Sequence, residues 1–169
     1  MLSLDSADSL HVFHGSPIRP ERPAFGSKGN QSITVSLGRP FFVTEVRAFA
    51  AFFARGGTLS SLKINSACML DLTAHENMDR LLEVFNADAM CPDAPWDEDI
   101  LGEVAESAYL LLESKAVWTY LVSQGIDAVR LMEQVHPRVE SIAIINPDII
   151  ERLSTHYLSR SDHDHSCGP

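Results

Sequence analysis

Cysteine, long apolar runs and cations near the N-terminus are all scarce in this chain. The three cysteines, Cys68, Cys91 and Cys167, are odd in number and have no metal-ligand spacing, so the sequence predicts neither a disulfide framework nor a zinc site. No apolar run approaches the roughly 20 residues that span a bilayer, and Asp5 and Asp8 stand where a secretory signal needs cations and apolar residues. We therefore expect a soluble protein of a reducing cytoplasm, without a membrane partner.

Positive charge is also scarce. The 13 Lys and Arg residues are outnumbered by 23 Asp and Glu, which leaves a formal net charge of -10. This charge repels a phosphate backbone and disfavours nonspecific nucleic-acid binding. The chain also lacks GxGxxG after a strand, GxxxxGK(S/T), HExxH and GxSxG. It therefore lacks the signatures of Rossmann dinucleotide folds, P-loop proteins, zincins and α/β-hydrolases.

The chain nevertheless has enough apolar residues to bury a core. Its 169 residues are 45% hydrophobic, and this length is typical of one domain. We expect that domain over residues 1–153. Residues 154–169 turn to Ser, His and Asp, which predicts a flexible tail.

Periodicity in the sequence predicts strands at both ends and helices in the middle. The β-prone runs are residues 11–16, 33–37, 41–44, 59–65, 69–72, 128–132 and 141–145. Helical spacing or a starting proline marks residues 46–53, 78–85, 101–112, 117–122 and 148–153. This order is not a strict βαβα alternation, so it predicts an α+β fold with split antiparallel-type sheets, a cleft between them and a helical middle.

Three features of the sequence could carry chemistry, and each also has a plain structural explanation. His14-Gly15-Ser16 ends the first strand, where a ring donor, a bare backbone and a small hydroxyl suit a nicotinamide riboside; an ordinary strand-end turn is the alternative. Phe41, Phe42, Val43 and Thr44 precede a helix with Phe53, and these aromatic rings could sandwich a planar ring or pack in the core. In the strand, Phe41 and Phe42 point to opposite faces, so one can line a cleft while the other is buried.

The third feature is a carboxylate beside a late β-prone run. Glu140 precedes residues 142–145, where strand pairing would hold its backbone, and we expect it to be the functional carboxylate. Glu133, which leads into a proline-containing connection, is the alternative. An exposed glutamate at a strand start would explain Glu140 without any function.

In this order, the three features resemble the ADP-ribosyltransferase superfamily, in the His-Tyr-Glu branch typified by diphtheria toxin and the poly(ADP-ribose) polymerases. That branch has His-Gly-Ser/Thr on a first strand, a Tyr-Phe-Thr-like strand before a helix with an aromatic residue, and a late Glu. Residues 125–150 also resemble the ending Gly-Tyr-Asp-Gly-Val … Glu-x-x-Val-Val-Phe-Asn-Pro … Ile of small bacterial and phage members. The resemblance covers residues 12–150. It departs at Phe42, which stands where the family usually has tyrosine.

The resemblance implies an enzyme that cleaves NAD between nicotinamide and ribose and transfers the ADP-ribose. Glu140 would stabilise the developing positive charge, and Arg19 would contact the pyrophosphate. The other residues that the resemblance assigns to NAD are His14, Gly15, Ser16, Phe42, Thr44 and Phe53.

Such a chain looks like a glycosyltransferase-class effector or toxin that modifies a cytoplasmic protein, or less readily a nucleic acid, and that a partner protein neutralises. One alternative is an inactive binding or inhibitor protein of the same fold, suggested by Phe42. A second is transfer of an RNA 2′-phosphate to NAD, which the net charge opposes. A third is a metal site in the tail at Asp162, His163, Asp164, His165 and Cys167, where an uncapped chain end is a poor scaffold. We expect no bound metal.

Overall fold

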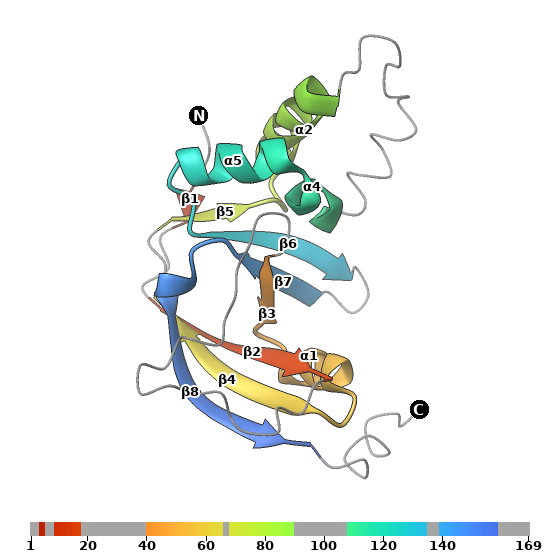
Figure 1. The fold of residues 1–169 in the computed structure, drawn as a ribbon, viewed down its shortest axis with the longest axis vertical. Helices are drawn as coiled ribbons and strands as arrows, with labels where there is room; N and C mark the ends of the chain where they lie inside the picture. The colour runs from red at the N-terminus through yellow and green to blue at the C-terminus, as the bar shows by residue number, and fades with distance from the viewer. Residues whose placement is uncertain are drawn as a thin grey trace.

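The computed structural model describes residues 4–5, 9–17, 40–65, 68–89, 108–134 and 139–158. Figure 1 shows the arrangement of their elements. The strands are β1 (Leu4–Asp5), β2 (Leu10–Ser16), β3 (Phe41–Thr44), β4 (Thr58–Ile64), β5 (Met69–Asp71), β6 (Ala128–Gln134), β7 (Val139–Ile144) and β8 (Ile150–Tyr157). The helices are α1 (Arg47–Ala54), α2 (His75–Ala89), α4 (Tyr109–Glu113), α5 (Lys115–Ser123) and the short 3-10 helix η1 (Pro147–Ile149).

The fold is α+β, as the sequence predicts. The strands form one mixed sheet in the order β1-β5-β6-β7-β3-β2-β4-β8, in which β5 and β6 are parallel and the other neighbours antiparallel. The strands β2, β3 and β7, expected to lie close together, are adjacent. In Figure 1, α2, α4 and α5 gather beside β5 and β6, whereas α1 lies beside β2 at the other end of the sheet.

The sequence predicts two separate sheets. This prediction is wrong, because hydrogen bonds join all eight strands into one sheet. The link between its halves is nevertheless narrow. β2 pairs with β4 along its whole length, from Leu10 to Ser16, but its register with β3 consists of Phe13 opposite Thr44. We call this junction of β2 and β3 the seam.

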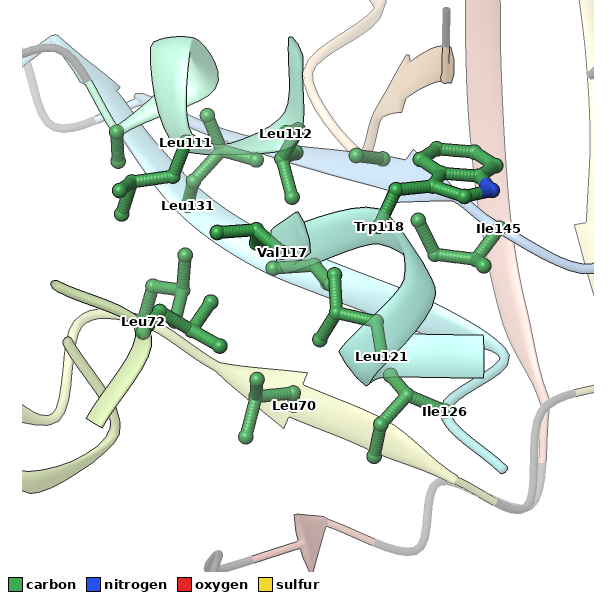
Figure 2. Close-up of a cluster of buried hydrophobic side chains, with 14 residues drawn as sticks. Leu70, Leu72, Leu111, Leu112, Val117, Trp118, Leu121, Ile126, Leu131 and Ile145 are labelled. Carbon is green, nitrogen blue, oxygen red and sulfur yellow. The ribbon is translucent and has the colours of Figure 1, made fainter. Parts of the chain in front are cut away.

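Two clusters of buried side chains lie on opposite faces of the sheet. The helical cluster contains Val129, Leu131 and Ala143 from the sheet and Trp118 and Leu121 from α5. In Figure 2, residues of α5 and Leu112 of α4 point toward the sheet residues. The strand cluster takes the alternate positions, which include Val12, Val43, Ala128, Ile142 and Ile144. Alternation along β6 and β7 thus assigns each residue to a face.

The end of the chain differs from the sequence prediction. A short helix is expected over residues 148–153, but η1 ends at Ile149 and β8 begins at Ile150. Residues 154–157, expected in the tail, continue β8 and pair with β4. The helix stops because pairing along β4 satisfies the backbone of this segment and buries Ile150, which outweighs the local signal of Pro147. The expected strand at 33–37, most of the expected helix at 101–112 and residues 159–169 lie outside the described residues.

Candidate ligand cavity at the seam

A cavity of about 400 Å³ lies at the seam, within the range of small-molecule sites. Strand β2, strand β3 and helix α1 supply most of its lining, and α4, β6 and β7 add one residue each. The lining residues are Phe13, His14, Gly15, Pro17, Phe42, Val43, Thr44, Phe49, Ala50, Phe53, Arg55, Tyr109, Glu133 and Ser141. Five of the residues that the family resemblance assigns to NAD line this cavity together: His14, Gly15, Phe42, Thr44 and Phe53.

His14 crosses the seam. Its Nδ1 lies 2.8 Å from the carbonyl oxygen of Phe42, and its ring centroid lies 4.1 Å from that of Phe41. Because a carbonyl only accepts, Nδ1 carries the proton and the neutral ring has its lone pair on Nε2. Burial lowers the pKa of His14 below the ordinary value of 6.5; the hydrogen bond to Phe42 opposes this effect and the charge of Arg152 adds to it. The ring is therefore a neutral hydrogen-bond acceptor at neutral pH.

Gly15 is required by the packing of α1. A Cβ atom built on Gly15 would overlap the carbonyl oxygen of Ala50 and lie 2.9 Å from the backbone nitrogen of Ala54. Any side chain would push the helix off β2. The absence of a side chain at Gly15 therefore lets α1 pack against β2, and Gly15 also lines the cavity.

The aromatic residues divide between the two faces of β3 as the alternation predicts. Phe41 packs against the strand cluster, whereas Phe42 packs against the helical cluster and lines the cavity. On α1, Phe53 lies edge-on to Phe49 with centroids 5.0 Å apart and remains 47% exposed. Phe42 and Phe53 therefore line the same cavity from two elements.

Thr44 holds the turn between β3 and α1. Its Oγ1 donates to the backbone oxygen of Glu140 at 2.8 Å and accepts from the backbone N–H of Val46 at 3.2 Å. Thr44 is buried, with 4% exposure, and lies opposite Ser141 in the register of β3 and β7. The start of α1 is thereby tied to the strand that carries Glu140.

The structure does not bring the expected carboxylate, Glu140, into the cavity lining. Glu140 shares a face of β7 with Ile142 of the strand cluster, and its carboxylate lies 3.6 Å from Nη1 of Arg130. Its neighbour Ser141 lies on the opposite face and lines the cavity.

Glu133, the alternative carboxylate, does line the cavity. The register of β6 with β7 shifts between Met132, opposite Glu140, and Gln134, opposite Val139, so Glu133 is the extra residue of a β-bulge. Bulges bend a strand and re-aim a side chain, and they are frequent beside active sites. Glu133 alternates along β6 with Val129 and Leu131 of the helical cluster, so it lies on the face of the sheet from which Ser141 also lines the cavity.

The remaining expected residues are placed differently. Ser16 ends β2 opposite Thr58 and is not part of the cavity lining, and Arg19 lies outside the described residues. Three polar lining residues were missed from the sequence: Arg55, Tyr109 and Ser141. Only Arg55 has a local signal, since it precedes Gly56-Gly57 at the end of a helical pattern.

Among the described residues, no helix combines the length and apolar character needed to cross a membrane. No protein-family model and no curated protein matches this sequence. A solved structure described as an anti-CRISPR protein is similar over 88% of this chain and 98% of its own, with 15% identity and a TM-score of 0.46. A similarity at that level carries no conclusion about family or activity.

Proposed function

We propose that the seam cavity binds the nicotinamide end of NAD and that the protein is an ADP-ribosyltransferase acting on a cytoplasmic macromolecule. One observation carries the proposal. Residues from β2, β3, α1 and β6, far apart in the sequence, line one cavity, and they include a histidine, the aromatic residues Phe42 and Phe53 and a carboxylate. These residue types, in this chain order, are the ones that the resemblance to the His-Tyr-Glu branch associates with NAD.

The cavity lining suits this ligand chemically. The rings of Phe42 and Phe53 offer stacking surfaces for a planar heterocycle, worth about 0.5–1.5 kcal/mol beyond burial. The neutral ring of His14 supplies an acceptor for a ribose hydroxyl through Nε2, since Nδ1 is held by Phe42. Beyond Phe13 the register of β2 with β3 stops, which supports a role for the Gly15 backbone in binding the carboxamide.

Glu133 is the carboxylate that we assign to catalysis, in place of Glu140. In the reaction, the bond between nicotinamide nitrogen and ribose C1′ breaks with both electrons leaving on nicotinamide, and C1′ then bonds to a nucleophile of the acceptor. A carboxylate at the cavity would accept a hydrogen bond from the ribose 2′-hydroxyl and stabilise the positive charge that develops on the ribose. Glu133 lines the cavity, whereas Glu140 is engaged with Arg130 on the other face.

The test compares two substitutions of the same type. The purified full-length chain is incubated with NAD, released nicotinamide is quantified by chromatography, and transfer of labelled ADP-ribose to proteins of a bacterial lysate is followed. We expect Glu133→Gln to lower the rate at least about 100-fold, because one electrostatic group in such a site is typically worth 10²–10³. We expect Glu140→Gln to stay close to the wild-type rate below its melting temperature.

Three other outcomes would change the assignment. Loss of activity in Glu140→Gln alone would restore the carboxylate expected from the sequence. Binding of NAD without nicotinamide release or transfer would point to an inactive binding protein of this fold, in which Phe42 lacks the hydroxyl of the usual tyrosine. Absence of NAD binding in the wild-type chain would remove the proposal.

A further inference from the structure

Arg55 occupies a backbone conformation that disfavours arginine. It follows the last residue of α1 with φ 46° and ψ 41°, in the left-handed region. Among the described residues, it is the one non-glycine with positive φ, and the next residue, Gly56, also has positive φ at 79°. Helices usually place glycine at such a position, because a Cβ atom is strained there. Arginine therefore occupies a position where glycine would fit the backbone better.

Arg55 lines the seam cavity and is exposed. Within the described lining, it is the one residue with a permanent positive charge, and Glu133 is the one with a carboxylate. The two side chains form no ion pair with each other, and the described part of the chain offers no other carboxylate within 4.0 Å of Arg55. Arg80 and Arg130, by contrast, each contact a carboxylate. The cavity thus presents two separate opposite charges.

We infer that Arg55 binds a phosphate group of the ligand, so that the cavity is complementary to a dipolar molecule. This inference rests on the proposed function. In NAD, the nicotinamide ring is cationic and the pyrophosphate anionic, which suits a carboxylate and a guanidinium lining the same cavity. A guanidinium is well matched to phosphate because it can donate two parallel hydrogen bonds. Arg55 directly follows the end of α1 and lines the same cavity as Phe53.

A second explanation is purely structural, because a cation at a helix C-terminus interacts favourably with the helix dipole. The two explanations differ in what happens when the charge is removed. If Arg55 serves only the helix, its loss affects unfolding and leaves ligand affinity unchanged. If it binds phosphate, its loss selectively weakens anionic ligands.

The experiment measures binding of ADP-ribose and of nicotinamide to the full chain by isothermal titration calorimetry; neither ligand can turn over. We expect Arg55→Gly to weaken ADP-ribose at least about 10-fold, the usual order for a charge-assisted contact, and to leave nicotinamide unchanged. The dependence of ADP-ribose affinity on KCl concentration should also become shallower. The thermal midpoint should not fall, since glycine relieves the positive φ.

The matched control is Arg47→Ala, which removes an exposed arginine from the first residue of α1, outside the cavity lining, and should leave both affinities unchanged. If Arg55→Gly is unstable, Arg55→Asn removes the charge with a residue that tolerates the left-handed region.

Each remaining outcome counts against the inference. Equal affinity of ADP-ribose for wild type and the Arg55 variants would overturn it while leaving the proposed function standing. Weakening of both ligands together would mean that Arg55 shapes the cavity and does not bind phosphate. Failure of the wild-type chain to bind either ligand would remove the proposed function, and this inference with it.

Discussion

His14 donates a hydrogen bond from Nδ1 to the carbonyl oxygen of Phe42 at 2.8 Å, across the seam where the backbone register of β2 and β3 consists of Phe13 and Thr44. A side chain therefore continues a connection between the halves of the sheet beyond the point where the backbone pairing stops. The same contact sets the tautomer of His14 and brings its ring to the cavity.

Stability should fall in acid because of His14. Its pKa is lowered in the folded chain, mainly by burial, so below about pH 6.5 the unfolded chain binds more protons at this residue than the folded chain does. The free energy of unfolding therefore decreases as the pH falls through 6.5 and levels off below the folded pKa. Urea denaturation near pH 5 and near pH 8 measures the difference. We expect a smaller difference in His14→Asn, and an equal difference in both chains would contradict the account.

The contact between Arg130 and Glu140 should contribute to stability. Both side chains are 22% exposed, and Nε of Arg130 is buried without a hydrogen-bond acceptor among the described residues. Because Glu140→Gln removes the charge that faces this guanidinium, we expect a loss of about 1–2 kcal/mol in chemical denaturation. Glu151→Gln provides the control, since its pair with Lys63 is exposed and should be worth under about 0.5 kcal/mol. Equal losses of unfolding free energy in the two variants would show that the contact between Arg130 and Glu140 stabilises the fold no more than the exposed pair does.

Gly15 should tolerate no side chain. Alanine there would overlap the backbone of Ala50, so α1 must shift, and we expect Gly15→Ala to cost about 3 kcal/mol. Differential scanning calorimetry should show a midpoint lowered by roughly 6–12 °C for a chain of this length. Gly125→Ala is the comparison: it has φ +68° and open space around its Cβ position, so it should cost only about 1 kcal/mol. If the thermal midpoint of Gly15→Ala were as high as that of Gly125→Ala, α1 would have to accommodate the added Cβ atom without loss of stability.

The helical cluster should depend strongly on α5. Leu121 is fully buried against β6 and β7 residues, and Leu121→Ala should cost about 2–5 kcal/mol through lost burial and the cavity left behind (Figure 2). The neighbouring Val122 is 54% exposed, so Val122→Ala should change stability by no more than about 0.5 kcal/mol. Guanidinium denaturation of both variants checks the contrast, and similar losses would place α5 differently on the sheet.

The sequence by itself determined the local elements and part of the cavity. The apolar spacing of Phe49, Ala50 and Phe53 marked α1, and alternation in β3 separated Phe41 from Phe42. Such patterns are readable because the periods of helix and strand are set by the backbone, whatever the partner. The grouping of His14, Phe42 and Phe53 as one candidate site came from the family resemblance, and all three line the seam cavity.

Only the tertiary structure decided which carboxylate reaches the cavity and how the chain ends. Glu133 lines the cavity because it shares a face of β6 with Leu131, whereas Glu140 shares the opposite face of the sheet with Ile142. Which face of a strand meets the cavity depends on the elements that pack on each side of the sheet, so the alternation within β6 or β7 does not reveal it alone. Likewise, β8 replaces the expected helix because β4 offers it a partner along its length, and the register of a strand with a distant partner is not encoded in local periodicity.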